Sequence, residues 1–164
     1  MNTKTLLFVA SIFLMTLLYA CGSDDGTSVP ITERVKGTWI QTSFQTDCPE
    51  VLGEDSRDEI IEFACDESNC RRIILGDSTY VTANTINGVV SRVQEFYLFT
   101  VDANGELVGS EIEICDGVGF NRNCFRSFEI NQNGNTLTLI RRSDDEECVD
   151  SFVYVREATT PDGG

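Results

Sequence analysis

Three Asn-Gly pairs, each set between apolar runs, place the strongest constraint on how this 164-residue chain can fold. Because Asn and Gly both tolerate positive φ, such a pair is typical of a tight two-residue β-hairpin turn. The sequence therefore predicts antiparallel strands joined by short turns. The pairs are Asn87-Gly88, Asn104-Gly105 and Asn133-Gly134.

The runs between the turns have the two-residue period of half-buried strands. Residues 111–114 and 136–139 alternate strictly between polar and apolar, and residues 89–101 form the longest strand-like run. No stretch after Lys36 has a helical period. Counting runs predicts eight strands, the third with a break at Gly76-Asp77 left open: about 37–46, 58–65, 70–83, 89–102, 106–115, 124–131, 136–142 and 149–156.

Short connections between successive runs favour antiparallel neighbours arranged as a meander. Eight such strands bury one apolar face by closing on themselves, which also removes unpaired edges. We therefore expect an all-β fold, an eight-stranded antiparallel up-and-down barrel. A two-sheet β-sandwich is the alternative that the sequence leaves open.

The first twenty residues differ in composition from the rest of the chain. Lys4 is their only charge, and residues 6–18 are almost entirely apolar. A positive start, a short apolar stretch and a small residue at its exit are typical of a secretory signal. As a helix the stretch would rise only about 20 Å, against about 30 Å of bilayer hydrocarbon, so a transmembrane anchor is the poorer interpretation.

The exit of this segment, Leu18-Tyr19-Ala20-Cys21, resembles the lipobox of bacterial lipoproteins. The resemblance implies that residues 1–20 are a lipoprotein signal peptide and that Cys21 carries diacylglycerol and an N-linked acyl chain such as palmitate. Several acyl chains give stable attachment where one is marginal. We therefore expect a lipid-anchored protein of the bacterial outer membrane, with the lipid bilayer as its partner.

Residues 21–30 are small, polar and acidic, and predict a flexible tether. Within them, Ser23-Asp24-Asp25 resembles an acidic export signal of surface lipoproteins, so the cell surface and the periplasmic side both stay open. Residues 159–164 predict a disordered tail. The remaining residues, 31–158, have the length of one ordinary domain.

Six cysteines remain once Cys21 is assigned to lipid: Cys48, Cys65, Cys70, Cys115, Cys124 and Cys148. An even number in an oxidising compartment predicts three disulfides. No histidine and no C-x-x-C spacing is present, so we expect no metal site.

The pairing follows from the predicted hairpins. Cys65 and Cys70 flank one short loop, and Cys115 and Cys124 flank another, so each pair should face across two strands. This leaves Cys48 with Cys148, on strands that are neighbours only if the barrel closes. The rival pairing joins Cys48 to Cys65 or Cys70.

The first strand opens with Gly37-Thr38-Trp39, which resembles the G-x-W motif at the start of lipocalin barrels. Together with the leader, the meander and the ending at residues 152–156, it makes most of the mature chain similar to the lipocalin-like lipoproteins of Gram-negative bacteria. The resemblance implies that Trp39 closes the base of the barrel, with Arg156 over its ring as a cation–π partner.

One departure concerns the face that Trp39 shares in this strand. Gln41 and Ser43 lie on that face by alternation, whereas Ile40 and Phe44 point away. Either the strand carries a bulge, or its outer face is covered by the loop at residues 48–53.

Composition excludes several functions. Removing Lys4 leaves 11 basic against 27 acidic residues, a formal net charge of −16, which argues against nucleic acid as a partner. The absence of histidine removes Ser-His-Asp and Cys-His schemes. The paired carboxylates lie in predicted loops beside other charges, and no phosphate-binding loop is present. We therefore expect no enzyme and no cofactor.

The first hypothesis is that the barrel binds a small, mainly apolar ligand at the open end opposite Trp39, in a pocket of about 300 Å³ or more. The acidic surface favours neutral or cationic ligands over fatty acids. The alternative is a non-catalytic surface protein that displays acidic loops to an unknown protein partner. The inward side chains expected to line or fill the interior are Tyr97, Phe99, Ile112, Ile114, Leu137 and Leu139.

Overall fold

The computed structural model describes residues 29–48, 59–101, 103–104, 107–117, 121–143 and 148–158. A single helical turn, α2 (Ile31–Arg34), precedes the strands. The strands are β1 (Gly37–Thr46), β2 (Ile60–Glu62), β3 (Cys70–Leu75), β4 (Thr79–Ile86), β5 (Val89–Val101), β6 (Leu107–Asp116), β7 (Asn123–Asn133), β8 (Thr136–Arg142) and β9 (Val149–Arg156).

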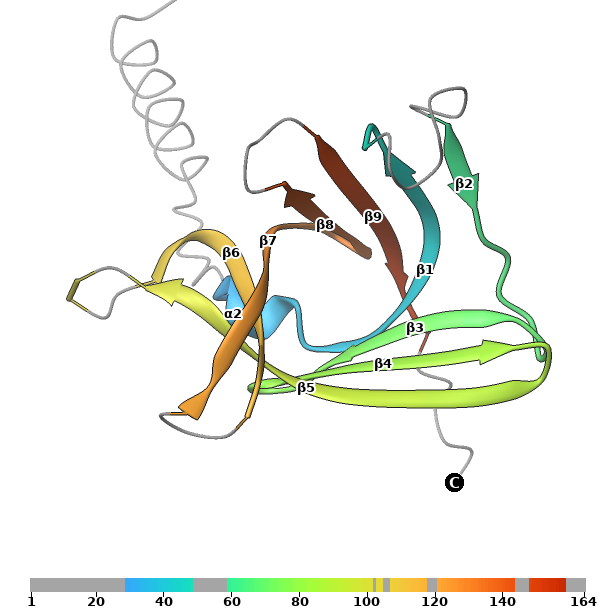
Figure 1. Cartoon of the computed structure of the whole chain (residues 1–164), viewed down its shortest axis with the longest axis horizontal. Helices are drawn as coiled ribbons and strands as arrows, with labels where there is room; N and C mark the ends of the chain where they lie inside the picture. Colours follow the sequence, from blue (N-terminus) through green and yellow to red (C-terminus); the bar gives the residue numbers. More distant parts are fainter. Residues whose placement is uncertain are drawn as a thin grey trace, which may run out of the picture.

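Eight of the strands form a closed antiparallel barrel. The order β1-β3-β4-β5-β6-β7-β8-β9 follows the chain, and β9 pairs back onto β1 from Trp39 opposite Arg156 to Thr46 opposite Asp150. Strand β2 stands outside this ring and pairs with the end of β1 (Figure 1). The predicted eight-stranded antiparallel barrel is therefore confirmed, and the sandwich alternative was wrong.

Two of the predicted strands differ from the observed ones. The break at Gly76-Asp77 that was left open in residues 70–83 is present, and the run forms β3 and β4. The turn is closed by the Gly76 N–H donating to the Thr79 carbonyl at 2.9 Å. Residues 58–65 yield only the three-residue β2, which flanks the barrel instead of completing it.

Two predicted turns lie in the described residues. Asn87 and Gly88 both have positive φ, of 51° and 75°, and join β4 to β5 as the Asn-Gly signature predicts. In the second, Asn133 still belongs to β7 and pairs with Thr136. Its turn is therefore centred one residue later than predicted. The third pair, Asn104-Gly105, falls partly outside the described residues.

A bulge explains the irregular pattern of β1. The register against β9 shifts between Gln41 and Ser43, which inserts Thr42 as an extra residue. The shift turns Phe44 to the inner side, where its ring lies 4.9 Å from that of Phe152. The bulge interpretation is therefore confirmed. The loop at residues 48–53 lies almost wholly outside the described residues.

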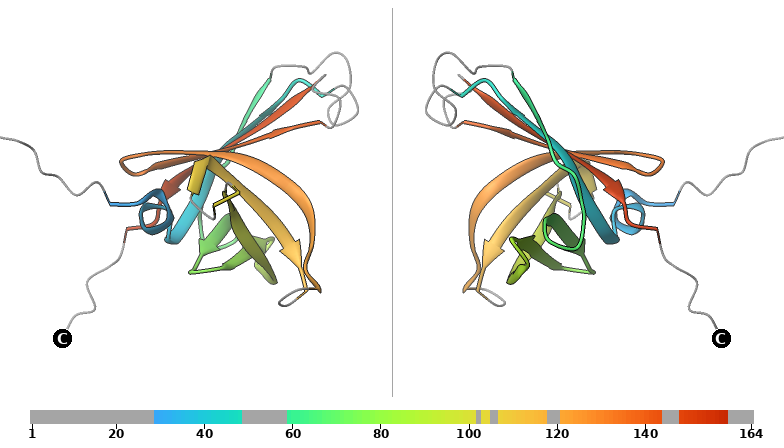
Figure 2. Two further views of the ribbon diagram at one scale, coloured as in Figure 1. Left: turned by 90° about the vertical axis from the view of Figure 1, so that its left-hand side faces the viewer. Right: turned by 90° about the vertical axis from the view of Figure 1, so that its right-hand side faces the viewer.

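Trp39 closes one end of the barrel, called here the closed end. Its side chain is fully buried, and its indole N–H donates to the Val35 carbonyl at 2.7 Å. The Arg156 guanidinium lies 4.1 Å from the Trp39 ring centre, so the predicted cation–π pair is present. Arg156 also donates to the carbonyls of Arg34 and Lys36. As a result, α2 and the end of β9 lie together at this end (Figure 2).

Gly37 is required where the chain enters the barrel. Its φ is +122°, in the region that favours glycine, and a Cβ placed there would lie 2.8 Å from Arg156 Nη1. The glycine of the G-x-W motif therefore lets Arg156 approach the backbone next to Trp39.

The disulfides gather at the opposite end, called here the open end. They join Cys48 to Cys148, Cys65 to Cys70 and Cys115 to Cys124, as predicted. Cys48 and Cys115 lie at or just past the ends of β1 and β6. Cys70, Cys124 and Cys148 lie at or just before the starts of β3, β7 and β9, and Cys65 lies between β2 and β3. The rival pairings of Cys48 are therefore not formed.

Candidate functional site

The barrel interior changes from apolar to polar between its two ends. Near the closed end the inward side chains form a buried apolar core around Trp39. Beyond this core, at whose border Tyr80 and Tyr154 lie, the same faces of the strands carry Arg71, Glu95 and Arg126. Polar side chains at inward positions place the candidate site in the open half of the barrel.

The expected ligand-lining residues belong mainly to the core. Tyr97, Ile112, Ile114, Leu137 and Leu139 are each at most 2% exposed and pack against one another and their neighbours. Phe99 is partly buried, and its ring lies 5.6 Å from that of Tyr97. These side chains fill the interior and do not line the cavities described below.

A cavity of about 140 Å³ opens within the polar half. Three of its polar side chains, those of Gln41, Tyr80 and Tyr154, are buried, with 5–8% of each residue exposed. Gln41 donates to the Ser43 carbonyl at 3.4 Å and the two tyrosine hydroxyls interact with each other, so these groups have protein partners and also border the open volume. The full lining is Gln41, Arg71, Arg72, Ile73, Tyr80, Thr82, Asn84, Ile86 and Tyr154.

Two tyrosine hydroxyls meet in this half of the barrel. Burial raises the pKa of Tyr154 well above its ordinary value, and interaction with the Tyr80 hydroxyl raises it further. Burial also raises the pKa of Tyr80, although the nearby Arg126 opposes that shift. Both phenols are therefore neutral at neutral pH and present hydroxyl groups that donate and accept hydrogen bonds.

Of the three arginines near the tyrosines, two are paired with described carboxylates and one is not. Arg126 donates to the Glu95 carboxylate at 2.5 Å, so these two charges offset each other. Arg72 is paired with Glu157 at 3.1 Å. Arg71 forms no ion pair with any described residue, and its guanidinium instead stacks 4.0 Å from the Phe63 ring centre. The described lining of the cavity includes two arginines and no carboxylate.

A second cavity, of about 310 Å³, adjoins the first and is called here the side groove. It exists because β1 changes partner: its first residues pair with β3, and residues 43–45 pair with β2. The barrel wall thus divides near the open end. The groove is lined by Glu62, Phe63, Ala64, Asp66, Asn69, Cys70, Arg71, Thr85 and Ile86.

The loop between β2 and β3 is held rigidly against the barrel. The Asp66 side chain accepts hydrogen bonds from the Ser68 and Asn69 N–H groups, both at 2.7 Å, inside the Cys65–Cys70 disulfide. From this loop, the Asn69 side chain accepts from the Asn87 N–H, and the Ser68 carbonyl accepts from the Gly88 N–H. The loop therefore fixes the tip of the β4–β5 hairpin beside the side groove.

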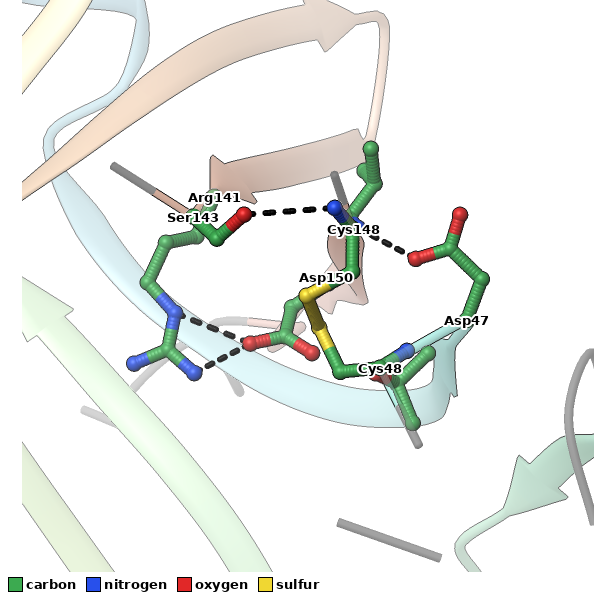
Figure 3. Close-up of a disulfide and its surroundings, with 8 residues drawn as sticks. Asp47, Cys48, Arg141, Ser143, Cys148 and Asp150 are labelled. Atoms are coloured by element: carbon green, nitrogen blue, oxygen red, sulfur yellow. Dashed lines mark hydrogen bonds and ion pairs between the residues drawn. A yellow bond between two sulfur atoms is a disulfide. The ribbon is translucent and has the colours of Figure 1, made fainter. Parts of the chain in front are cut away.

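The rim formed by β8 and β9 contains an ion pair between a buried carboxylate and a partly exposed arginine, beside a disulfide (Figure 3). Asp150 is 2% exposed, and its Oδ2 accepts from Arg141 Nε at 2.9 Å, whereas its Oδ1 has no partner. Next to the pair, the Cys148 N–H donates to the Ser143 hydroxyl at 3.2 Å. The bond between Cys48 and Cys148 closes the seam between β1 and β9 at this rim.

Two clusters bring cysteines and carboxylates within ligand distance of one another. One includes Asp47 with the Cys48–Cys148 sulfurs, and the other Glu113 with the Cys115–Cys124 sulfurs. In both, the two sulfurs are bonded to each other, so no thiolate is free to bind a metal. The clusters are explained by the disulfides.

Sequence reasoning missed the residues that line the cavities. Arg71 lies on the same face of β3 as the core residue Ile73, and Tyr80 and Tyr154 are themselves core residues. Only the pairing of strands brings the three together. A polar residue at a core-facing position of an alternating run was the available signal. Cys21, the predicted lipidation site, lies outside the described residues.

Comparison with protein-family models and with curated proteins gives no match to this chain. In the described residues, no helix is long and apolar enough to cross a membrane. The class of protein is therefore defined here by its fold, a small disulfide-bonded antiparallel β-barrel with a polar cavity toward its open end.

Proposed function

We propose that this chain is a lipid-anchored envelope lipoprotein whose barrel, similar to that of lipocalins, holds a small ligand at its open end. The single observation that supports binding is the cavity beside Gln41, Tyr80 and Tyr154, three buried polar side chains facing an open volume. A barrel that served only as a platform would gain stability by filling this space with apolar side chains.

The ligand differs from the one that the sequence suggested. The apolar half of the interior is occupied by the protein's own side chains, so a ligand would contact the polar half instead. The inner cavity, at about 140 Å³, is smaller than the expected pocket. With the adjoining groove of about 310 Å³ it reaches the size of ordinary small-molecule sites.

The lipid anchor is supported by the sequence alone, through the apolar leader and Leu18-Tyr19-Ala20-Cys21. Detergent phase separation of cells that express the full chain tests it. The wild-type protein should enter the detergent phase, and the Cys21→Ser variant should not be labelled by radioactive palmitate. Recovery of unlabelled wild-type protein in the aqueous phase would contradict the proposal.

Native mass spectrometry tests the binding function. The chain from residue 22 onward, which includes every described residue, is exported behind an unrelated leader, oxidised and incubated with small-molecule extracts of envelope material. We expect a mass adduct below about 500 Da that is lost when Tyr80 and Tyr154 are replaced by bulkier Trp. If no extract yields an adduct, display of loops to a protein partner becomes the better account.

A further inference from the structure

The inner cavity and the side groove share two lining residues, Arg71 and Ile86. Arg71 is the second residue of β3 and Ile86 ends β4, and the two strands are paired neighbours. A molecule that occupied both volumes would therefore pass between these side chains. The two volumes differ in chemistry, so each selects a different part of that molecule.

The inner cavity favours negative charge even though the chain is strongly acidic. Arg126 and Arg72 are each offset by a carboxylate, whereas Arg71 has no ion-pair partner in the described residues. Both Arg71 and Arg126 act electrostatically on the buried Tyr154 hydroxyl. Arg71 is itself exposed, so its attraction for an anion depends on direct contact at the junction of the two volumes.

The side groove has apolar side chains that can contact the apolar part of a ligand. Phe63 and Ala64 follow β2, and Ile86 lies across from them with 50% of its surface exposed. Phe63 is held in place because its N–H donates at 2.8 Å to the carbonyl of Thr42, the bulge residue of β1. The stacked Phe63 ring in turn fixes the Arg71 guanidinium at the junction of the two volumes.

Of the two cavities, only the side groove has carboxylates in its described lining, those of Glu62 and Asp66. Asp66 uses one carboxylate oxygen to accept the N–H groups of Ser68 and Asn69. Glu62 is exposed, ends β2 and pairs with Ser43 of β1. A negative headgroup is therefore repelled from the groove and attracted to the inner cavity, which fixes the direction in which a ligand lies.

We infer that the two cavities form one site for an amphipathic monoanion, with its anionic head beside Arg71, Tyr80 and Tyr154 and its apolar part over Phe63 and Ile86. The inference rests on the proposed binding function and specifies the chemical class of the ligand. It reverses the preference for neutral or cationic ligands that the overall charge suggests.

Three probes with one chain length and different heads test the class: octanoate, 1-octanol and octylammonium. Each is titrated at pH 7 into the ¹⁵N-labelled chain from residue 22 onward, and chemical shifts give the dissociation constant and the location. Octanoate should shift the amides of Arg71, Tyr80 and Ile86 and bind at least about tenfold more tightly than octanol, because a charge-assisted pair exceeds a neutral one. Octylammonium should bind most weakly.

Arg71→Gln should weaken octanoate binding about tenfold or more and leave octanol binding within about twofold. The matched control is Arg92→Gln, which removes an exposed guanidinium from β5, where Arg92 lies on the opposite face of the strand from the inward-facing Glu95. It should change neither constant, and unchanged dispersion of the spectra shows that each variant is folded.

Each remaining outcome is decisive. If octanol or octylammonium binds as tightly as octanoate, or if Arg71→Gln behaves like Arg92→Gln, the anion inference is wrong and the binding function stands. If octanoate binds more tightly than octanol but shifts amides other than those of Arg71, Tyr80 and Ile86, the proposed position of the ligand is wrong. If no probe binds, and extracts also give no adduct by mass spectrometry, the proposed function fails together with the inference.

Discussion

The disulfide between Cys48 and Cys148 should be the most stabilising of the three. It closes a loop of 100 residues, whereas the other two close loops of 5 and 9. In the chain-entropy description, a loop of this length is worth about 4.7 kcal/mol at 25 °C, against about 2 kcal/mol and about 2.6 kcal/mol for the short ones. For a domain of ordinary stability, the first value is a large part of the free energy of unfolding.

Paired Cys→Ser variants test this order. The β1–β9 ladder pairs residues 39–46 with 150–156 without help from the sulfurs, so a variant lacking Cys48 and Cys148 should still form the barrel at low temperature. Urea unfolding at 25 °C without reductant, followed by far-ultraviolet circular dichroism, gives the free energy of each variant. The reasoning is refuted if the variant lacking Cys65 and Cys70 loses as much stability as the one lacking Cys48 and Cys148.

Three further predictions concern single residues. Gly37→Ala should lower the free energy of unfolding by about 1–3 kcal/mol, because its Cβ would meet Arg156 in a backbone conformation that Ala avoids; thermal unfolding measures it, and no loss would contradict the account of the motif. Arg141→Leu should cost about 2 kcal/mol by leaving the buried Asp150 carboxylate unpaired, less than for a fully buried pair because Arg141 is 42% exposed. Adding Asp150→Asn to the Arg141→Leu variant should recover part of the lost free energy of unfolding in urea. If it does not, the loss does not come from the unpaired Asp150 carboxylate. The raised pKa of Tyr154 keeps its proton in the folded state after the unfolded chain has lost it, so stability should fall as pH rises above about 10. A pH series of urea midpoints should show a shallower fall for Tyr154→Phe, and identical slopes would argue against this linkage.

The barrel could be predicted from the sequence because local and global signals agree. Alternation, turn chemistry and cysteine spacing each specify antiparallel neighbours, and a disulfide between the first and last strands requires closure. The number of barrel strands was right, although one predicted strand divides at Gly76 and another lies outside the ring. Which of these segments joins the ring could not be predicted, because Ile60–Phe63 and Ile73–Leu75 have equally strand-like side chains.

The candidate site could not be predicted for a different physical reason. A polar residue in a strand faces solvent in most sheets, so Arg71 and Tyr80 look like surface residues until the register is known. The bulge at Thr42 moves Phe44 inward, and the partner change of β1 opens the side groove. Both depend on long-range pairing. By contrast, the Trp39–Arg156 contact was expected from a family resemblance that covers the ends of the barrel.

The position of α2 has a consequence for how the barrel would stand on a membrane. The described chain enters the barrel beside Trp39 and leaves it after Arg156, so both connections lie at the closed end. If Cys21 is acylated, the ten residues 21–30 reach at most about 35 Å when fully extended. The barrel would then stand close to the lipid surface on its closed base, with the mouth turned toward the surrounding fluid. Solutes could enter and leave from that side while the protein stayed attached.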